Sequence, residues 1–303
     1  MNQEIGKKLL SILKVEQVKK DEPMKIHTTF RVGGPASYFV TPETEEEVVK
    51  VIEVCTQENV PYYIVGNGSN LLVSDQGYEG VIIQIYKQMN QVEITENEIH
   101  AQAGALLSMI ANRAMEAELT GFEFAAGIPG TLGGACVMNA GAYGGEMKDV
   151  LETVTVLTRD GDVKTLTKDE LELGYRTSVI AKKDYIVLSA VIRLENGKKE
   201  EIKAVIDDLK EKRITKQPLE YPSAGSTFKR PEGYFAGKLI QDAGLRGFQV
   251  GGAQVSEKHC GFVVNKDQAT AADVMNLMNQ VSDKVYEMSG VRLEPEVKRL
   301  GVF

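Results

Sequence analysis

The chain has 303 residues, of which 43% are apolar and 26% charged, and its formal net charge is −8. This composition is typical of a folded globular protein of two or three domains and argues against extensive disorder. The negative charge disfavours binding to nucleic acids and membrane surfaces. No segment resembles a signal peptide or reaches membrane-spanning length. We therefore expect a soluble, cytoplasmic protein, and no obligate protein partner is evident from the sequence.

Cysteine and histidine are scarce in this chain. The three cysteines are far apart and odd in number, so a disulfide framework is not expected: Cys55, Cys136 and Cys260. The three histidines show no metal-ligand spacing, and we predict no metal site.

Apolar periodicity, capping signals and turn residues predict the order of helices and strands. Helices are expected over residues 3–20, 44–59, 106–118, 200–213, 235–243 and from 270 to a stop at Gly290. Strands are expected over residues 62–65, 81–85, 92–95, 99–103, 154–157, 163–166, 186–194, 261–264 and 291–298. Residues up to about 195 thus form an α+β domain of two lobes, and polar residues 195–199 mark its boundary.

The last predicted helix is strongly amphipathic. Thr270 and Asp273 form a capping box at its start. Its apolar residues recur with helical spacing, so we expect one buried face made of Val274, Leu277, Met278, Val281, Val285 and Met288.

A glycine-rich stretch runs from Gly127 to Gly145, and seven of its nineteen residues are glycine. Glycine is used where φ is positive or where the backbone must approach a ligand closely. Successive neutral backbone amides form an anion-binding concavity that suits a phosphate. A glycine-rich connector is the alternative, but residues such as Ile128 and Leu132 are apolar, unlike a flexible linker. We expect a buried, ligand-facing loop.

A second small-residue loop, Gly66-Asn-Gly-Ser-Asn70, follows the predicted strand at 62–65. It is not the dinucleotide fingerprint of parallel sheets, because Leu71 stands where a third glycine is required and a strand, not a helix, follows. A plain hairpin turn is the alternative interpretation. Two such loops in one half of the chain favour a dinucleotide cofactor.

Three polar clusters are further candidates for chemistry. They are Tyr175-Arg-Thr-Ser178, Ser223-Ala-Gly-Ser226 and the pair Glu294 and Glu296. Taken singly, each also fits an ordinary structural element: a surface turn, a capping or turn motif, and a solvated strand face.

Taken together, five motifs resemble the UDP-N-acetylenolpyruvoylglucosamine reductase family. They are Gly66 to Leu71, Gly127 to Gly145, Gly174-Tyr-Arg-x-Ser178, Pro222-Ser-Ala-Gly-Ser-x-Phe-Lys229 and Leu293-Glu-Pro-Glu-Val297, and they occur in the family's order over nearly the whole chain. The short distance from Arg176 to Ser226 resembles the shorter subtype, which lacks a tyrosine-bearing substrate loop.

The resemblance implies a two-lobed FAD-binding domain of the PCMH/vanillyl-alcohol-oxidase type with a smaller α+β substrate domain. Lobe one would cover residues 1–75 with the returning strand 291–303, lobe two 76–198, and the substrate domain 199–290. It also implies non-covalent FAD, reduced by NADPH in the pocket that then admits the enolpyruvyl sugar nucleotide. The implied FAD contacts are Val65, Gly66, Asn67, Gly68, Ser69, Asn70, Gly127, Ile128, Pro129, Gly130, Thr131, Gly133, Gly134, Asn139, Gly141, Ala142 and Tyr143.

The same resemblance assigns catalytic roles to three residues. Ser226 would protonate the substrate carbon after hydride transfer, while Arg176 and Glu296 would stabilise the enolic intermediate. Arg176 would act through its charge, and Glu296 by holding or sharing a proton. Arg213, Lys216, Gly225 and Lys229 are the implied substrate contacts.

One departure from the family pattern concerns the substrate site, and two other functions remain open from sequence. Longer members commonly have Asn where this chain has Arg230, so the resemblance implies no substrate contact at that position. One alternative is an oxidase or dehydrogenase of alcohols or hydroxy acids from the same FAD-binding superfamily. The other is a non-catalytic nucleotide- or flavin-binding module. Retention of Ser226, Arg176 and Glu296 favours the reductase over both.

Overall fold

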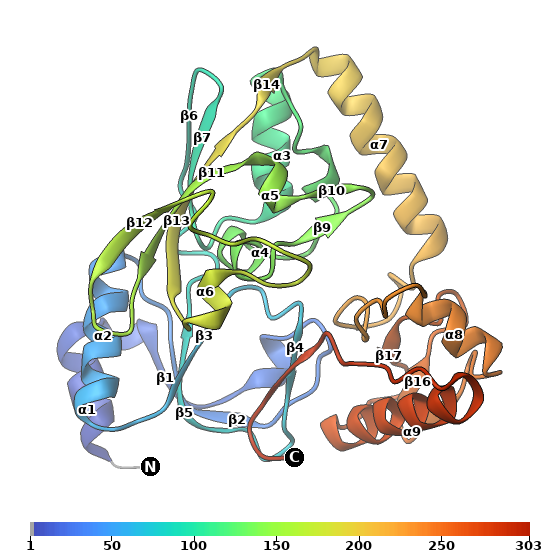
Figure 1. Cartoon of the computed structure of the whole chain (residues 1–303). Helices are drawn as coiled ribbons and strands as arrows, with labels where there is room; N and C mark the ends of the chain where they lie inside the picture. The colour runs from blue at the N-terminus through green and yellow to red at the C-terminus, as the bar shows by residue number, and fades with distance from the viewer. Residues whose placement is uncertain (1–2) are drawn as a thin grey trace. The chain divides into compact units, whose positions relative to one another are not determined.

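Helices are interspersed with runs of strands along residues 3–303, the part of the chain that this computed structural model describes (Figure 1). The helices are α1 (Gln3–Ile12), α2 (Glu45–Gln57), α3 (Leu107–Glu116), α4 (Leu132–Met138), α5 (Met147–Val150), α6 (Val179–Lys182), α7 (Lys199–Lys216), α8 (Ala236–Asp242) and α9 (Ala271–Ser289). Single 3₁₀ turns lie at Val15–Gln17, Met24–Ile26 and Glu123–Ala125.

The strands are short, and many pair with a neighbour in sequence. They are β1 (Val18–Pro23), β2 (Pro35–Val40), β3 (Tyr62–Val65), β4 (Leu71–Val73), β5 (Tyr78–Gln84), β6 (Val92–Thr95), β7 (Glu98–Gln102), β8 (Leu119–Thr120), β9 (Gly141–Ala142), β10 (Gly145–Glu146), β11 (Leu151–Leu157), β12 (Val163–Thr167), β13 (Ile186–Arg193), β14 (Glu195–Asn196), β15 (Gln249–Val250), β16 (Ala253–Val255), β17 (Val263–Asn265) and β18 (Lys298–Leu300).

The chain divides into two units, each with its own buried core. The first unit comprises Met1–Lys19, Tyr38–Asn67 and Val81–Arg213. The second comprises Lys20–Ser37, Gly68–Gly80 and Ile214–Phe303. No helix within residues 3–303 combines the length and the apolar character needed to cross a membrane.

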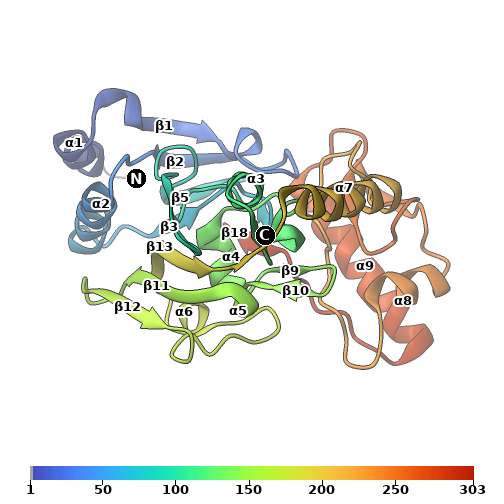
Figure 2. The same cartoon turned by 90° about the horizontal axis from the view of Figure 1, so that it is seen from above.

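An antiparallel sheet in the order β12-β11-β13-β7-β6 forms one part of the first unit. Figure 2 shows β11 between β12 and β13. The predicted turn at 159–162 does join β11 to β12 as a hairpin, with Leu157 opposite Val163. Alternate residues of β11, among them Val154 and Val156, are fully buried, as a sheet with one covered face requires. The helix α4 packs against β13.

The other part of the first unit contains α1, α2, β3 and the end of β5. The hydroxyl of Thr44 accepts the Glu47 N–H and begins α2, as its sequence predicts. Val48, Val51 and Cys55 bury one face of this helix, and α1 packs beside it. β3 and β5 pair in parallel.

The second unit combines the sheet β15-β16-β17 with α8 and α9 (Figure 1). The predicted capping box begins α9, because Thr270 Oγ1 accepts the Asp273 N–H and the Asp273 carboxylate accepts the Thr270 N–H. Gly290 ends the helix with a left-handed φ of 71°. Asp75 also caps this helix: its carboxylate oxygens accept the N–H groups of Ala271 at 2.8 Å and Ala272 at 2.9 Å.

Three local predictions differ from the structure. Met288 is 62% exposed rather than buried, because α9 extends past the core there and its last turn faces solvent. The first helix ends at Ile12, because Lys14 has an extended backbone (φ −67°, ψ 156°) and starts a separate 3₁₀ turn before β1. Residues 291–297 form only an isolated bridge, between Pro295 and Phe228, and no regular strand, because Pro295 has no N–H to continue a ladder.

Candidate active site

The start of the loop at 66–70 lies beside the glycine-rich stretch in the first unit, which contains Gly66 and Asn67 of that loop. Asn67 Nδ2 donates a 2.7 Å hydrogen bond to the carbonyl of Pro129. A Cβ on Gly66 would lie 2.3 Å from Oγ1 of Thr131, so only glycine allows this approach without displacement. The end of a buried strand, β3, therefore delivers the first loop directly onto the second.

These loops present unused backbone donors. Within residues 3–303, the amides of Gly66, Asn67, Gly130 and Thr131 donate no hydrogen bond to a protein acceptor. Unpaired N–H groups in two adjoining neutral loops are the donor set that binds a phosphate without a charged side chain. The residues present therefore fit the pyrophosphate of a dinucleotide.

Part of the second loop forms regular secondary structure, which its sequence did not predict. Residues 132–138 form α4 inside the predicted loop, and the Leu132 and Gly133 amides donate to the carbonyls of Ala105 and Ala103. These two amides are consequently occupied by protein partners. Pairing with the preceding segment at 103–107 turns this part of the loop into a helix.

The Asn139 side chain connects the glycine-rich stretch to the turn that contains Arg176 by hydrogen bonds. Its Nδ2 donates to the Glu146 carboxylate at 2.6 Å and to the Gly174 carbonyl at 3.1 Å, and its Oδ1 accepts the Lys148 N–H. The side chain is buried and its φ of 44° is left-handed. Its amide is thus engaged by protein groups; a contact between Asn139 and the cofactor stays a prediction.

Arg176 lies in a tight turn closed by two hydrogen bonds between Gly174 and Thr177. Its φ of 54° is in the left-handed region, which costs free energy for a residue with a side chain. Ser178, which begins α6, holds the other end of the turn because its hydroxyl donates to the Val137 carbonyl at 2.6 Å. The Arg176 guanidinium lies over the Tyr175 ring at 5.4 Å.

Arg213, a predicted substrate contact, lies against the start of the glycine-rich stretch. A Cβ on Gly127 would lie 3.0 Å from a guanidinium nitrogen of Arg213. Burial lowers the pKa of Arg213, and the nearby Tyr143 partly offsets this effect. Tyr143 lies between β9 and β10, is 45% exposed and has a left-handed φ of 52°.

In the second unit, the predicted catalytic residues Ser226 and Glu296 belong to two segments that backbone hydrogen bonds join, one of them made by Thr227, the residue after Ser226. The Thr227 carbonyl accepts the Glu296 N–H at 2.8 Å. Two positions along, the Lys229 N–H donates to the Glu294 carbonyl at 2.8 Å. Residues 226–229 and 294–297 therefore run antiparallel, and Ser226 remains exposed.

The remaining predicted substrate contacts of the second unit differ in environment. Lys229 Nζ forms a 3.1 Å ion pair with the Glu294 carboxylate, and Lys216 is exposed at the end of α7. Gly225 has a φ of 74°, which strains any other residue. Arg230 lies 4.0 Å from the centroid of the Phe235 ring.

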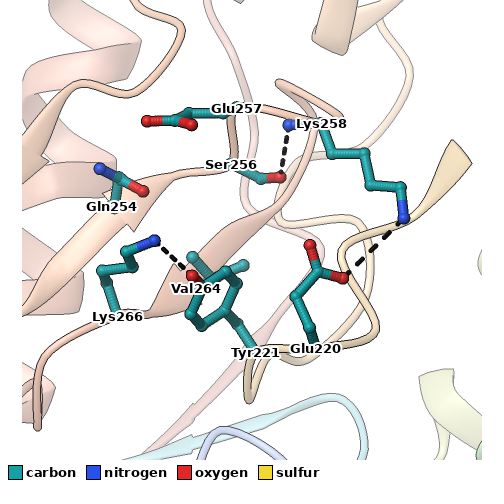
Figure 3. A pocket seen from close by; sticks show the side chains of 8 residues that line it. All are labelled: Glu220, Tyr221, Gln254, Ser256, Glu257, Lys258, Val264 and Lys266. Atoms are coloured by element: carbon teal, nitrogen blue, oxygen red, sulfur yellow. Dashed lines mark hydrogen bonds and ion pairs between the residues drawn. The ribbon is translucent and has the colours of Figure 1, made fainter.

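A separate cavity of about 330 Å³ lies in the second unit (Figure 3). Its walls are Glu220, Tyr221, Gln254, Ser256, Glu257, Lys258, Val264 and Lys266. Lys266 Nζ donates to the Tyr221 hydroxyl, which raises the lysine pKa, and Lys258 Nζ donates to the Ile214 carbonyl at 2.6 Å. Both cations are thus engaged by protein groups, and no predicted site residue lines the cavity.

Two family models match parts of this chain. A family model described as FAD binding domain matches residues 36–167. The C-terminal domain model of UDP-N-acetylenolpyruvoylglucosamine reductase matches residues 217–300. Together with the paired glycine loops, the first match defines an FAD-dependent α+β protein: a two-lobed FAD-binding domain of the PCMH/vanillyl-alcohol-oxidase type with a smaller α+β substrate domain.

Full-length relatives give the family. The reductase of Agathobacter rectalis is 56% identical over the whole of both chains, and that of Clostridioides difficile is 54% identical over 99% of each. The crystal structure of MurB from Thermus caldophilus superposes with a TM-score of 0.80 at 37% identity, covering 92% of this chain and 97% of that one. The chain belongs to the UDP-N-acetylenolpyruvoylglucosamine reductase family.

The sequence motifs included Ser178 without giving it a role, and they missed Thr227. Ser178 was visible as part of a motif, and its hydroxyl both begins α6 and anchors the Arg176 turn. Thr227 lies between residues of the serine motif and gave no signal of its own. Its importance depends on partners that are distant in sequence.

Proposed function

We infer that this chain reduces UDP-N-acetylglucosamine enolpyruvate to UDP-N-acetylmuramate, an NADPH-dependent step of peptidoglycan precursor synthesis. Membership of the reductase family over the full length is the observation that supports it most strongly. A non-catalytic flavin module and an alcohol oxidase both fit this observation less well. Bound FAD would supply the hydride chemistry that connects NADPH with one carbon of the substrate alkene.

We propose that the amides of loops 66–67 and 130–131 hold the FAD pyrophosphate. The close packing of these loops and their unused donors support this assignment. The other FAD contacts implied by the resemblance, including Val65 and residues 141–143, remain part of the proposal.

We propose that Ser226 donates its hydroxyl proton to the substrate carbon that hydride transfer leaves electron-rich. A serine is a weak acid, but an enolate carbon is a strong base, and such general acid help contributes about 10²–10⁴-fold. Arg176 stabilises the enolate oxygen electrostatically, a contribution of about 3 kcal/mol for a well-placed donor. Glu296 holds or shares a proton with the same intermediate.

We propose that Arg213, Lys216, Gly225 and Lys229 contact the substrate. Gly225 supports this role because its left-handed backbone leaves space beside Ser226, and a Cβ placed on it would have no atom within 4 Å. Lys229 is paired with Glu294, so an anionic group of the substrate has to compete with that carboxylate. We also propose the division into residues 1–75 with 291–303, 76–198 and 199–290, and a cytoplasmic location without an obligate partner.

The experiment is a pair of anaerobic half-reactions on the FAD-loaded protein. NADPH is expected to bleach the flavin absorbance, and UDP-N-acetylglucosamine enolpyruvate is expected to restore it. Ser226→Ala is expected to bleach normally and to recover about 10²–10⁴-fold more slowly. Bleaching without recovery in the unaltered protein would reject the proposed substrate, and turnover of an alcohol with oxygen would favour an oxidase.

A further inference from the structure

Thr227 is a fully buried polar residue that follows the exposed Ser226, with 0% of its surface accessible. Its N–H donates to the Gly261 carbonyl at 2.9 Å, and its hydroxyl oxygen accepts the Val263 N–H at 2.8 Å. Its carbonyl accepts the Glu296 N–H at 2.8 Å. Thr227 therefore joins the segment that carries Ser226 (residues 223–227, the serine loop) to residues 261–263 on one side and to Glu296 on the other.

The hydroxyl bond joins the serine loop to the sheet of the second unit. Val263 is the first residue of β17, is 1% exposed, and is opposite Val255 of β16. A buried N–H that loses its acceptor costs about 1–3 kcal/mol. The hydroxyl thus fixes the loop to a strand that belongs to the core.

Glu296 is held from its other side as well. Asn70 Nδ2 donates to the Glu296 carbonyl at 3.3 Å, and the Asn70 carbonyl accepts the Lys298 N–H at 3.0 Å. Immediately afterwards, β18 pairs in parallel with β4. The Glu296 backbone is therefore fixed, and the Thr227 carbonyl is the acceptor nearest to Ser226 that registers the serine loop against it, beside the bond from the Lys229 N–H to the Glu294 carbonyl.

We propose that Thr227 is a positioning residue that sets Ser226 relative to Glu296 for protonation of the substrate carbon. This inference rests on the proposed function. Misplacing a reacting group by about 1 Å costs about 100-fold in rate. Reduction of the flavin by NADPH needs no proton from Ser226, so a displaced serine loop slows only the half-reaction with the enolpyruvyl sugar.

Thr227→Val tests this directly, because valine keeps the shape and removes the acceptor. Thr227→Ser is the matched control, since it keeps the hydroxyl. With FAD-loaded protein, we expect Thr227→Val to be bleached by NADPH at the unaltered rate and reoxidised about 10–100-fold more slowly. Thr227→Ser is expected to be reoxidised at the unaltered rate. If the valine variant does not fold, Thr227→Ala removes the same acceptor.

A double-mutant cycle separates positioning from general damage. If Thr227 acts through Ser226, adding Thr227→Val to Ser226→Ala causes no further loss of reoxidation. An equal further loss in that background, or an equal slowing of both half-reactions, would overturn the proposal. Failure of the unaltered protein to reoxidise with the sugar nucleotide would instead reject the proposed function, and this inference with it.

Discussion

Gly66 packs so closely against Thr131 that the substitution Gly66→Ala, which adds one methyl group, tests the proposed FAD site. In Gly66→Ala, the new Cβ would lie 2.3 Å from Thr131 Oγ1 and 3.2 Å from Cγ2. The φ of Gly66 is not left-handed, so alanine brings no backbone strain of its own. Any effect therefore comes from pushing the two loops apart.

The size of this effect follows from the overlap. The contact has to lengthen by about 1 Å to reach an ordinary van der Waals separation. Overpacking of this kind costs about 1–3 kcal/mol. If the separated loops lose that free energy in FAD binding, the affinity falls about 5- to 150-fold.

The assay is titration of the apoprotein with FAD, followed by flavin fluorescence. Thr131→Ala removes the atom nearest to the new Cβ, and it costs no helix cap because the Thr131 side chain makes no capping bond. Gly66→Ala with Thr131→Ala is expected to regain most of the affinity. Gly66→Ala with Thr131→Val is not, because valine fills the same space.

Two results would refute this reasoning. Unchanged FAD affinity in Gly66→Ala would show that the loops do not form the pyrophosphate site. A loss that Thr131→Ala does not repair would show that the clash is not its cause. If the FAD affinity is unchanged and only the thermal stability falls, the first of these results also shows that the contact stabilises the fold alone.

Further predictions concern the second unit. Asp75→Ala is expected to lower the free energy of unfolding by about 0.5–2 kcal/mol in urea titrations, because α9 loses two capping hydrogen bonds. An unchanged free energy of unfolding would show that the capping box of Thr270 and Asp273 is enough to begin the helix. Burial lowers the pKa of His259 from 6.5, and its Nδ1 accepts the Gly261 N–H at 3.1 Å, so the neutral ring stabilises the fold. That stability is complete above pH 6.5 and is lost as the pH falls through the lowered pKa; His259→Gln should lack this part of the pH dependence. Met278→Ala is expected to cost about 2–5 kcal/mol in the same titrations and Met288→Ala under about 0.5 kcal/mol, whereas equal costs would mean that both pack in the core.

Local chemistry determined much of the fold from sequence alone. Thr44 and Thr270 begin helices, and Gly290 ends one, because a short hydroxyl or a left-handed glycine satisfies end groups within a few residues. The hairpin at 159–162 was predictable because its turn residues are local too, with Gly161 taking a positive φ of 89°. Periodicity failed at Met288, since a helix can continue beyond the core it packs against.

The glycine loops illustrate a partial prediction. Their composition indicated close approach and a phosphate, and the structure brings Gly66 onto Thr131. The sequence did not indicate that residues 132–138 form α4 or that two amides are used by the carbonyls of Ala103 and Ala105. Those bonds depend on a segment nearly thirty residues earlier, which no local pattern contains.

The sequence implied the candidate catalytic residues but not the hydrogen bonds that hold them. Motif order alone implied Ser226 and Glu296, which lie about seventy positions apart in the chain. Only the tertiary structure revealed that Thr227 bonds to Glu296 on one side and to β17 on the other. Hydrogen bonds within a turn or helix end are encoded by neighbouring residues, whereas these depend on how distant segments pack, and packing is a property of the whole core.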